Sequence, residues 1–256
     1  MYIDTHAHLD FESFDEDRDA VIQRAIENKL SAIITIGTSL ETSRRAIELA
    51  ENYAFIFAAV GIHPSDCAEA GDEDYAEIEK MAAHEKVVAI GEIGLDYYKM
   101  YTEKAIQMAA FVRQIELARR VNLPVIVHNR EAHADVLKTL VEEKATDVGG
   151  VLHSFSGDAA FLGEVLKTNF FVSYTGGVTF KDPRGQDELA RLTPVDRMLL
   201  ETDSPFITPA PHRGKRNEPS FVIHTAKKIA ELKEMDVKEL AEATTANAKH
   251  LFTLTI

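Results

Sequence analysis

The chain has 256 residues and is 45% apolar, enough for one large α/β domain or two small ones. Its formal charge of −14 excludes a basic face over the whole molecule, so any polyanion must be bound at a local cationic point. We find no apolar run of about 18 residues and no signal-peptide pattern, so we expect no membrane association. The one cysteine, Cys67, excludes an internal disulfide and fits a reducing compartment, so we expect a cytoplasmic protein.

Short apolar, β-branched runs alternate with stretches of helical periodicity along the chain. A first strand starts at Met1-Tyr2-Ile3 and ends at His6 and His8. In chain order we then predict a helix over 14–29, a strand over 31–38, a helix over 40–53, a strand over 55–62 and a helix over 74–83. The pattern continues with a strand over 87–95, a helix over 102–121, a strand over 124–128, a helix over 131–144 and a strand over 149–153. It ends with a helix over 159–167, a strand over 170–174, a helix over 186–192, a strand over 198–203, a Pro-rich loop over 204–219, and helices over 220–235 and 237–251.

Eight strands, nearly all followed by a helix, indicate a parallel sheet, and their continuous apolar character indicates that both faces are covered. Eight such units in about 250 residues match the size of a (β/α)8 TIM barrel. We therefore predict an α/β fold, a single-domain barrel over residues 1–256 with an extra C-terminal helix. A doubly wound open sheet is the alternative, but it would place a Gly-rich phosphate turn where His6-Ala7-His8-Leu9 stands.

His6 and His8 are the first candidate functional residues. Side chains alternate between the two faces of a strand, so these imidazoles share a face and offer two metal ligands at one point. A His-X-His pair alone is weak evidence, because two histidines also meet by chance in a polar surface strand. The metal-site interpretation therefore depends on candidates at equivalent positions of later strands.

Such candidates stand at the C-terminal ends of the later strands. In a barrel these ends meet at one face, where active sites of this fold lie. Each residue singly could be a hydrogen-bonded loop residue, but the set favours metal binding. The seven residues at this rim are His6, His8, His63, Glu92, His128, His153 and Asp203.

All of these except His63 form the predicted ligand set. Four imidazoles and two carboxylates exceed what one tetrahedral ion needs, so we predict two divalent ions with Glu92 as the bridge. Two ions roughly 3.5–4 Å apart can activate one water and clamp the attacking and leaving oxygens of a hydrolysis. Glu201 has the same strand parity as Asp203, and it either orients that water or is a core acid paired with an Arg or Lys.

Six segments together closely resemble the TatD family of metal-dependent deoxyribonucleases, within the amidohydrolase superfamily. The resemblance covers Met1 to about Phe252 and depends on the order and spacing of the segments. Many amidohydrolase relatives bridge their metals with a carbamylated lysine at the end of the fourth strand, where this chain has Glu92, and this favours the TatD branch. The segments are Asp4-Thr5-His6-Ala7-His8-Leu9-Asp10, Gly61-Ile62-His63-Pro64, Gly91-Glu92-Ile93-Gly94-Leu95-Asp96, His128-Asn129-Arg130, His153-Ser154-Phe155-Ser156-Gly157 and Glu201-Thr202-Asp203-Ser204-Pro205.

The resemblance implies hydrolysis of DNA phosphodiester bonds, often from a 3′ end, by two divalent ions held by the ligand set above. Zinc or manganese suits four imidazoles, whereas magnesium, the ion usual for the family's nuclease activity, prefers oxygen ligands. The expected substrate is DNA, single-stranded or at 3′ ends, and we expect a monomer. We assign catalytic roles to Asp203, Glu92 and Glu201, with Asp203 also able to accept the proton of the attacking water.

Four residues are predicted to bind substrate. His63 and Arg130 lie beside the ligands, and an arginine can hold a phosphate through its bidentate fork. Arg213 and Lys215 belong to the densest basic stretch of the chain, in the loop that leaves the last strand. Phe155, Tyr97 and Tyr98 are candidates for stacking on a base, or for plain packing.

Two alternatives use the same metal site. The first is a hydrolase of small molecules, such as a cyclic amide, a lactone or a short phosphodiester, which the charge of −14 favours because a long polyanion would be repelled. The second is a metal-dependent binding protein without catalysis, which needs fewer ligands than this set and does not need Glu201.

Overall fold

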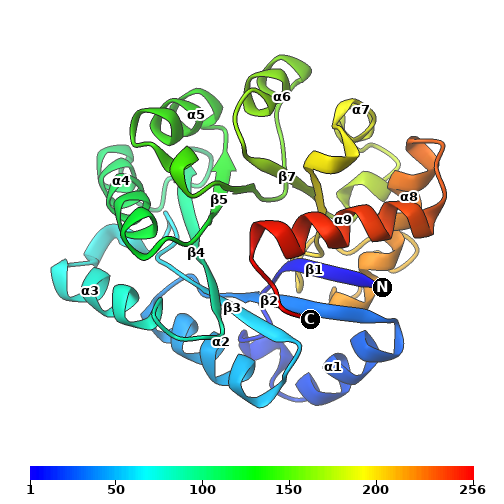
Figure 1. Cartoon of the computed structure of the whole chain (residues 1–256), viewed down its shortest axis with the longest axis horizontal. Coiled ribbons are helices and arrows are strands. Elements are labelled where there is room, and N and C mark those ends of the chain that lie inside the picture. Colours follow the sequence, from blue (N-terminus) through cyan, green and yellow to red (C-terminus); the bar gives the residue numbers. More distant parts are fainter.

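In the computed structural model, which describes all 256 residues, eight parallel strands form one sheet in the order of the sequence (Figure 1). The strands are β1 (Tyr2–Ala7), β2 (Leu30–Ile36), β3 (Ile56–Val60), β4 (Val87–Asp96), β5 (Val125–Arg130), β6 (Gly150–Leu152), β7 (Phe171–Tyr174) and β8 (Met198–Leu200). The helices are α1 (Arg18–Glu27), α2 (Leu40–Asn52), α3 (Asp72–Met81), α4 (Lys104–Val121), α5 (His133–Glu142), α6 (Ala159–Leu166), α7 (Gln186–Leu192), α8 (Val222–Leu232) and α9 (Val237–Leu251).

The sheet closes between its first strand and the segment that follows its last. Ala7 forms a parallel bridge with Ser204, and the His8 N–H donates to the Ser204 carbonyl at 2.8 Å. Asp4 fixes the same seam lower down, where its carboxylate accepts the Thr202 N–H at 2.9 Å. The predicted (β/α)8 barrel is therefore confirmed, and the open doubly wound sheet is excluded.

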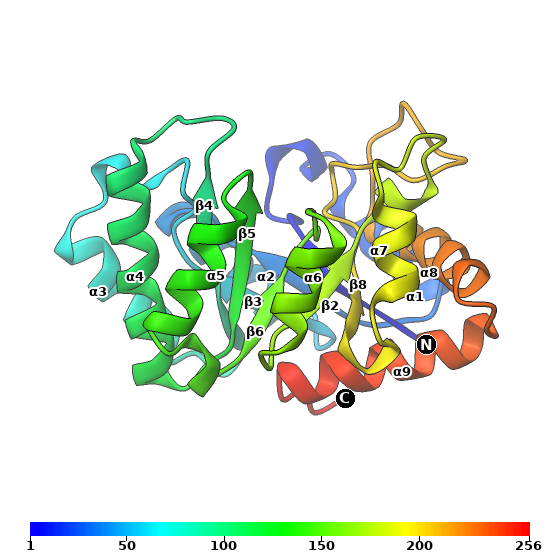
Figure 2. The same ribbon diagram turned by 90° about the horizontal axis from the view of Figure 1, so that it is seen from above.

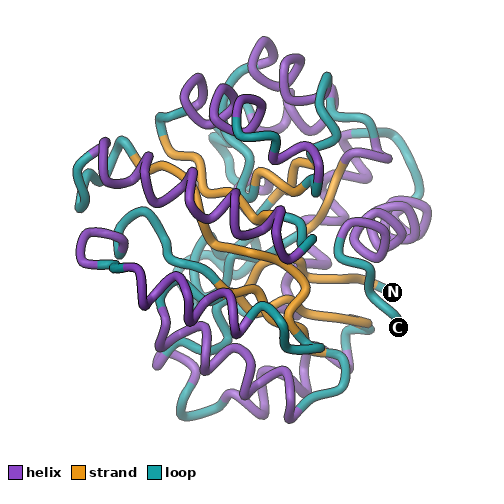
Figure 3. Tube along the Cα trace, turned by 60° about the vertical axis from the view of Figure 1, so that its left-hand side comes forward, coloured by secondary structure: helices purple, strands orange, loops and turns teal.

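The strands lie inside a surround of helices (Figure 3). Apolar side chains fill the barrel interior and form a separate layer between strands and helices. From Ala32 onward the residues of β2 alternate between them: Ala32, Ile34 and Ile36 belong to the interior cluster, and Ile33 belongs to the outer one. This division is the period-2 alternation of a strand that is buried on both faces. It explains why the predicted strands were continuous apolar runs.

Helix α9 covers one end of the barrel. Figure 2 shows it beneath the strands, at the end where both chain termini lie. Ala248 on α9, with Phe252 and Leu254 beyond it, packs into the interior cluster, and the Thr245 hydroxyl donates to the Met1 carbonyl at 3.2 Å. The extra C-terminal helix thus closes the N-terminal end of the barrel and leaves the C-terminal end for a site. No helix of the chain is long and apolar enough to cross a membrane.

The alternation of inward and outward side chains along strand β1 is interrupted close to the metal-site candidates. Its pairing with β2 is irregular between Asp4 and Ala7. Ile3 belongs to the interior cluster, whereas Ala7, which a regular strand would place on the same side, belongs to the outer layer. The irregularity turns His6, followed by His8, toward the open mouth, as bulges near active sites commonly do.

Two element boundaries differ from the predicted ones in ways that matter for the site. The first helix starts at Arg18 instead of residue 14, because a short 3-10 turn at Glu12–Phe14 comes first. The last strand ends at Leu200 instead of residue 203, and Asp203 has a left-handed backbone with φ of +54°. Such a conformation is unfavourable for most residues and is found mainly where the surrounding structure imposes it, often at functional sites.

Candidate metal centre

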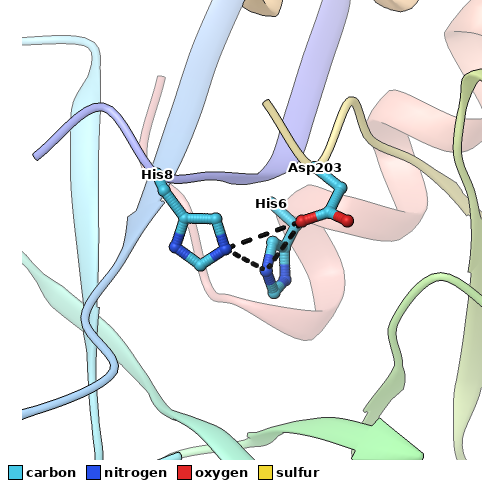
Figure 4. A group of neighbouring side chains, drawn as sticks. All are labelled: His6, His8 and Asp203. Carbon is cyan, nitrogen blue, oxygen red and sulfur yellow. Dashed lines mark hydrogen bonds and ion pairs between the residues drawn. The ribbon is translucent and has the colours of Figure 1, made fainter. Parts of the chain in front are cut away.

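Four donor atoms gather at the seam between β1 and β8. His6 Nε2 and His8 Nε2 are 3.3 Å apart, and Asp203 Oδ1 lies 3.8 Å from the first and 3.6 Å from the second (Figure 4). Glu92 Oε2, from β4 on the far side of the mouth, lies 3.4 Å from His6 Nε2 and 3.8 Å from His8 Nε2.

These four donors fit a tetrahedral divalent ion. Ligand atoms about 2.1 Å from a tetrahedral ion lie about 3.4 Å from one another, close to the separations between these atoms. Two of the donors are the Nε2 atoms of His6 and His8, which face each other at a separation that suits a cation held by both. The His8 Nδ1 atom lies 3.1 Å from the Ile36 carbonyl, so it carries the proton and directs the Nε2 lone pair into the site.

A second group of donors faces the other oxygen of Glu92. Its Oε1 atom lies 2.8 Å from His128 Nδ1 and 2.9 Å from His153 Nε2, and these two nitrogens are 3.4 Å apart. Glu92 therefore presents one oxygen to His6 and His8 and the other to His128 and His153. All six residues of the predicted ligand set lie together in one cluster at the barrel mouth.

Two buried carboxylates orient the histidines of the second group. Asp96 Oδ2 lies 3.1 Å from His128 Nε2, so the Nδ1 atom of that ring faces Glu92. Glu201 lies 3.5 Å from His153 Nδ1 and accepts hydrogen bonds from the Ser154 N–H at 2.6 Å and the Ser173 hydroxyl at 2.5 Å. Glu201 pairs with no arginine or lysine, so the core ion pair considered for it is wrong.

His63 lies in the same cleft, with its Nε2 atom 3.6 Å from Glu92 Oε1. Its Nδ1 atom accepts the Ser65 N–H at 3.1 Å, so in the neutral ring the proton is on Nε2. Burial and the neighbouring histidines lower the pKa of His63 to about 3, although the charge of Glu92 opposes them. His63 is thus a neutral hydrogen-bond donor that faces the site.

The carboxylates and imidazoles of the cluster stabilise each other's charged forms. Burial alone would raise the pKa of Glu92, but the charge of His153 and the hydrogen bonds from His128 and His153 hold it well below its usual value. Burial likewise lowers the pKa of His8, but the hydrogen bond with Asp203 and the charges of Glu92 and Asp203 raise it to about 9. Without metal, protons on the imidazoles therefore occupy the place of a cation.

The site opens into a cleft of about 260 Å³. His6 lies below it and is fully buried, whereas His8, Glu92 and Asp203 form its floor. Phe11 and Phe206 form an aromatic wall: the Phe11 ring stacks on His8 at 4.6 Å between centroids, and Phe206 contacts both rings edge-on. Phe206 is 51% exposed although it is large and apolar.

The remaining predicted residues lie outside this cleft. Arg130 and Arg213 line a neighbouring cavity, and Lys215 is exposed on the same loop as Arg213 and lines neither cavity. Phe155, a stacking candidate, is 1% exposed and packs in the core against Phe161, so that interpretation is wrong.

Sequence reasoning missed Asp96 and the aromatic wall. Asp96 stands four residues after Glu92, a spacing that a regular strand would place on the same face, and this parity was an available signal. Phe11 and Phe206 lie in loops, where no periodic pattern predicts which side chains contact one another. Their pairing follows from the closure of the barrel, which brings the loop after β1 beside the loop after β8.

A (β/α)8 barrel with this constellation at its C-terminal mouth is a metal-dependent hydrolase. The chain belongs to the TatD family, because the family model described as TatD related DNase matches residues 3–253. It is 51% identical over 252 residues to the uncharacterized metal-dependent hydrolase YabD of Bacillus subtilis, which spans 98% of this chain and 99% of that protein. A protein of Erwinia amylovora named 3'-5' ssDNA/RNA exonuclease TatD is 37% identical, over 98% of this chain and 99% of its own length. The crystal structure of YJJV, a TatD homolog from Escherichia coli K12, has a TM-score of 0.93 and 31% identity, covering 99% of this chain and 98% of that chain.

Proposed function

We propose that this chain removes nucleotides from the 3′ end of single-stranded DNA by hydrolysis, with two divalent cations bound at the cluster. The observation that carries the proposal is the position of Glu92, whose two oxygens face two separate groups of ligands. A shared carboxylate of this kind is typical of two-metal sites that act on phosphate esters. The Erwinia amylovora relative, named as an exonuclease on single-stranded DNA and RNA, supports the choice of substrate.

When bound, the cations would polarise the phosphoryl oxygens and lower the pKa of the attacking water. His6, His8 and Asp203 would hold one cation, His128 and His153 the other, and Glu92 both. The choice among zinc, manganese and magnesium stays open, since the four imidazoles favour the first two.

Asp203 takes the proton of the water in this proposal. Burial raises its pKa, but the hydrogen bond from His8 and the charge of His6 lower it below the usual value, so the group is ionised at neutral pH. The water oxygen bonds to phosphorus, the P–O3′ bond breaks, and the leaving 3′ oxygen takes up the proton held by Asp203. The Nε2–H group of His63 donates a hydrogen bond to a phosphoryl oxygen and keeps its proton, and Glu201 acts as a positioning residue through His153.

The aromatic wall supports a nucleotide over a purely polar substrate. Phe206 is half exposed at the edge of the cleft, where a base could stack on it as in other proteins that bind single strands. A small-molecule hydrolase is the second candidate, and the charge of −14 supports it because the surface away from the mouth repels a long polyanion.

The test uses the purified chain with manganese, magnesium or zinc and a single-stranded oligonucleotide labelled at its 5′ end. We expect a ladder of products shortened from the 3′ end, loss of activity with EDTA, and loss of activity in His6→Asn. His84→Asn is the matched control, because His84 lies on the surface, where its ring contacts Glu51 and the Lys86 N–H. Hydrolysis of lactones or cyclic amides with none of DNA would refute the nuclease and support the small-molecule alternative.

A further inference from the structure

A second cavity, of about 500 Å³, lies at the C-terminal end of the barrel beside the metal cleft. Its size is ordinary for a site that binds a small molecule or a nucleotide. Arg130 at the end of β5 and residues that follow β6, β7 and β8 form its walls. We call it the arginine pocket, after Arg130, Arg184 and Arg213 in its lining. Its other polar side chains are Ser154, Ser156, Gln186 and the carboxylate of Asp182.

The three arginines of the pocket lack carboxylate partners. Eight of the thirteen arginines in the chain form ion pairs, and two others, Arg191 and Arg197, donate to backbone carbonyls. Arg130, Arg184 and Arg213 are the remaining three, and none has a carboxylate within 4.0 Å. In a chain of charge −14, cations left unpaired together in one cavity indicate an anionic ligand.

Packing holds two of these arginines in place. The guanidinium of Arg213 lies 3.9 Å from the centre of the Phe180 ring and donates to the Thr208 carbonyl at 3.1 Å, so most of its N–H groups stay available. The Arg130 guanidinium lies 5.0 Å from the centre of the Tyr98 ring. Stacking of this kind fixes the plane of the fork and lowers the entropy lost when it binds a phosphate.

The pocket adjoins the metal cleft through three short pieces of chain. Arg130 comes two residues after His128, and Ser154 follows His153 directly. Ile207 of the pocket follows Phe206 of the cleft wall. The hydroxyls of Ser154 and Ser156 make no hydrogen bond within the protein, so they are free to donate to the same ligand. A ligand that spans both cavities would therefore place one group at the predicted metal site and a neighbouring anionic group in the arginine pocket.

We infer that the arginine pocket binds the phosphate one nucleotide to the 5′ side of the scissile phosphate. The inference rests on the proposed function, because cleavage at the 3′ end leaves substrate only on the 5′ side of the bond that breaks. It assigns as the preferred substrate a nucleotide chain that carries a second phosphate upstream of the one that is cleaved. A bidentate contact of this kind also fixes the distance between the chain end and the cluster.

The test compares two dinucleotides, TpT and its 5′-phosphorylated form pTpT, which differ only in that upstream phosphate. We expect KM about tenfold lower for pTpT with wild-type protein, as one charge-assisted contact would give. In the variant Arg184→Asn with Arg213→Gln we expect the KM for pTpT to rise until it equals the KM for TpT. Asn suits residue 184, which has φ of +51°. The control Arg120→Ala removes one arginine charge outside the pocket, from an ion pair with Glu79, and should keep the tenfold difference.

Direct binding separates the failure of this inference from failure of the proposed function. The affinity of a fluorescent 5′-phosphorylated oligonucleotide is measured at several salt concentrations, and the variant should bind more weakly with a smaller salt slope. If wild-type protein cleaves neither dinucleotide but the variant still binds more weakly, the nuclease proposal fails and the pocket stands. The inference about the pocket is overturned if a variant with wild-type Tm keeps the preference for pTpT or binds the oligonucleotide as tightly as wild type. If the double variant does not fold, Arg184→Asn alone, on an exposed loop, replaces it.

Discussion

Asp203 donates its backbone N–H to the carbonyl oxygen of His6 at 2.8 Å, across the seam where the barrel closes. The side chains of the same two residues face each other at 3.8 Å in the cluster. The bond that closes the fold and the contact that forms the candidate metal site therefore belong to one pair of residues from opposite ends of the chain. A cation bound there would hold the first and last strands together.

Metal removal should accordingly destabilise the protein. A ligand that binds only the folded state at a hundred times its Kd stabilises that state by about 2.7 kcal/mol. For a chain of this size, we expect EDTA to lower Tm by about 5–10 °C, from the usual shift of about 2–4 °C per kcal/mol. Differential scanning calorimetry with and without EDTA measures this, and re-addition of the ion in excess should restore the original Tm. An unchanged Tm in protein shown by elemental analysis to lose its metal would contradict a metal at the seam.

Asp203→Asn should abolish turnover and leave the fold intact. Asn keeps the size of the side chain and the backbone bond to His6, and it tolerates the left-handed backbone at this position. It cannot take a proton from water, so we expect kcat on single-stranded DNA to fall by at least about 100-fold. Tm of the metal-free variant should stay within about 3 °C of the metal-free wild type. Collapse of the fold would mean that Asp203 is needed for structure instead.

The sequence predicted the barrel because every level of the pattern agreed. Eight apolar runs of strand length alternate with helices, and no glycine-rich turn competes after β1. It also predicted which six side chains share one rim, since the C-terminal ends of parallel strands meet in a barrel. Period-2 reasoning about His6 and His8 led to the observed facing although β1 is irregular, because the irregularity lies before both residues or at the first of them.

The sequence could not predict the contacts that depend on closure of the barrel and on the conformation of its loops. Phe11 and Phe206 meet because the loops after β1 and β8 become neighbours. Arg184, in the segment after β7, lines one cavity with Arg130 at the end of β5. The tautomer of His63 depends on one backbone N–H at Ser65. Each of these contacts has no local pattern, since it joins residues whose separation in the chain carries no periodicity.

Metal affinity should rise with pH up to about 9. His8 has a folded-state pKa of about 9, whereas an unfolded histidine titrates near about 6.5. Protonated His8 therefore stabilises the metal-free fold fully below about pH 6.5, and this contribution is lost as pH rises through about 9. Because a metal ion must displace that proton, binding releases protons into the buffer. Calorimetric titration in two buffers with different ionisation enthalpies measures their number.

The matched variant for this pH effect is His8→Gln, which cannot be protonated. Urea denaturation of metal-free protein at pH 6 and pH 9 should give a larger loss of stability for wild type than for His8→Gln. Equal losses in the two proteins would assign the pH dependence to other groups. His84→Gln, on the surface, should behave as wild type.

Asp96→Asn should weaken metal binding more than it weakens the fold. Asp96 Oδ2 faces His128 Nε2, and removal of a partner of this type commonly costs about 10–100-fold in metal affinity. Asn retains an oxygen for the bonds that Oδ1 accepts from the Tyr98 and Lys99 N–H groups. Asp96→Ala loses these bonds too, so it should lower both metal affinity and Tm. Competition with a fluorescent chelator measures the affinity, and equal affinity in Asp96→Asn and wild type would show that Asp96 does not orient the ligand.

Phe206→Ala should raise KM for single-stranded DNA without changing stability. Stacking of one base on an aromatic side chain contributes about 1–3 kcal/mol, which corresponds to a KM increase of about 5-fold to 150-fold if the wall binds a base. Because Phe206 is half exposed, its loss removes little buried apolar surface, and Tm should change by less than about 2 °C. Tyr101→Ala is the control, because Tyr101 is another exposed aromatic residue and lines neither cavity, and it should leave KM unchanged. Phe206→Leu separates stacking from bulk: an apolar side chain without a ring should restore little of the affinity, and full restoration would mean that the wall acts by shape alone.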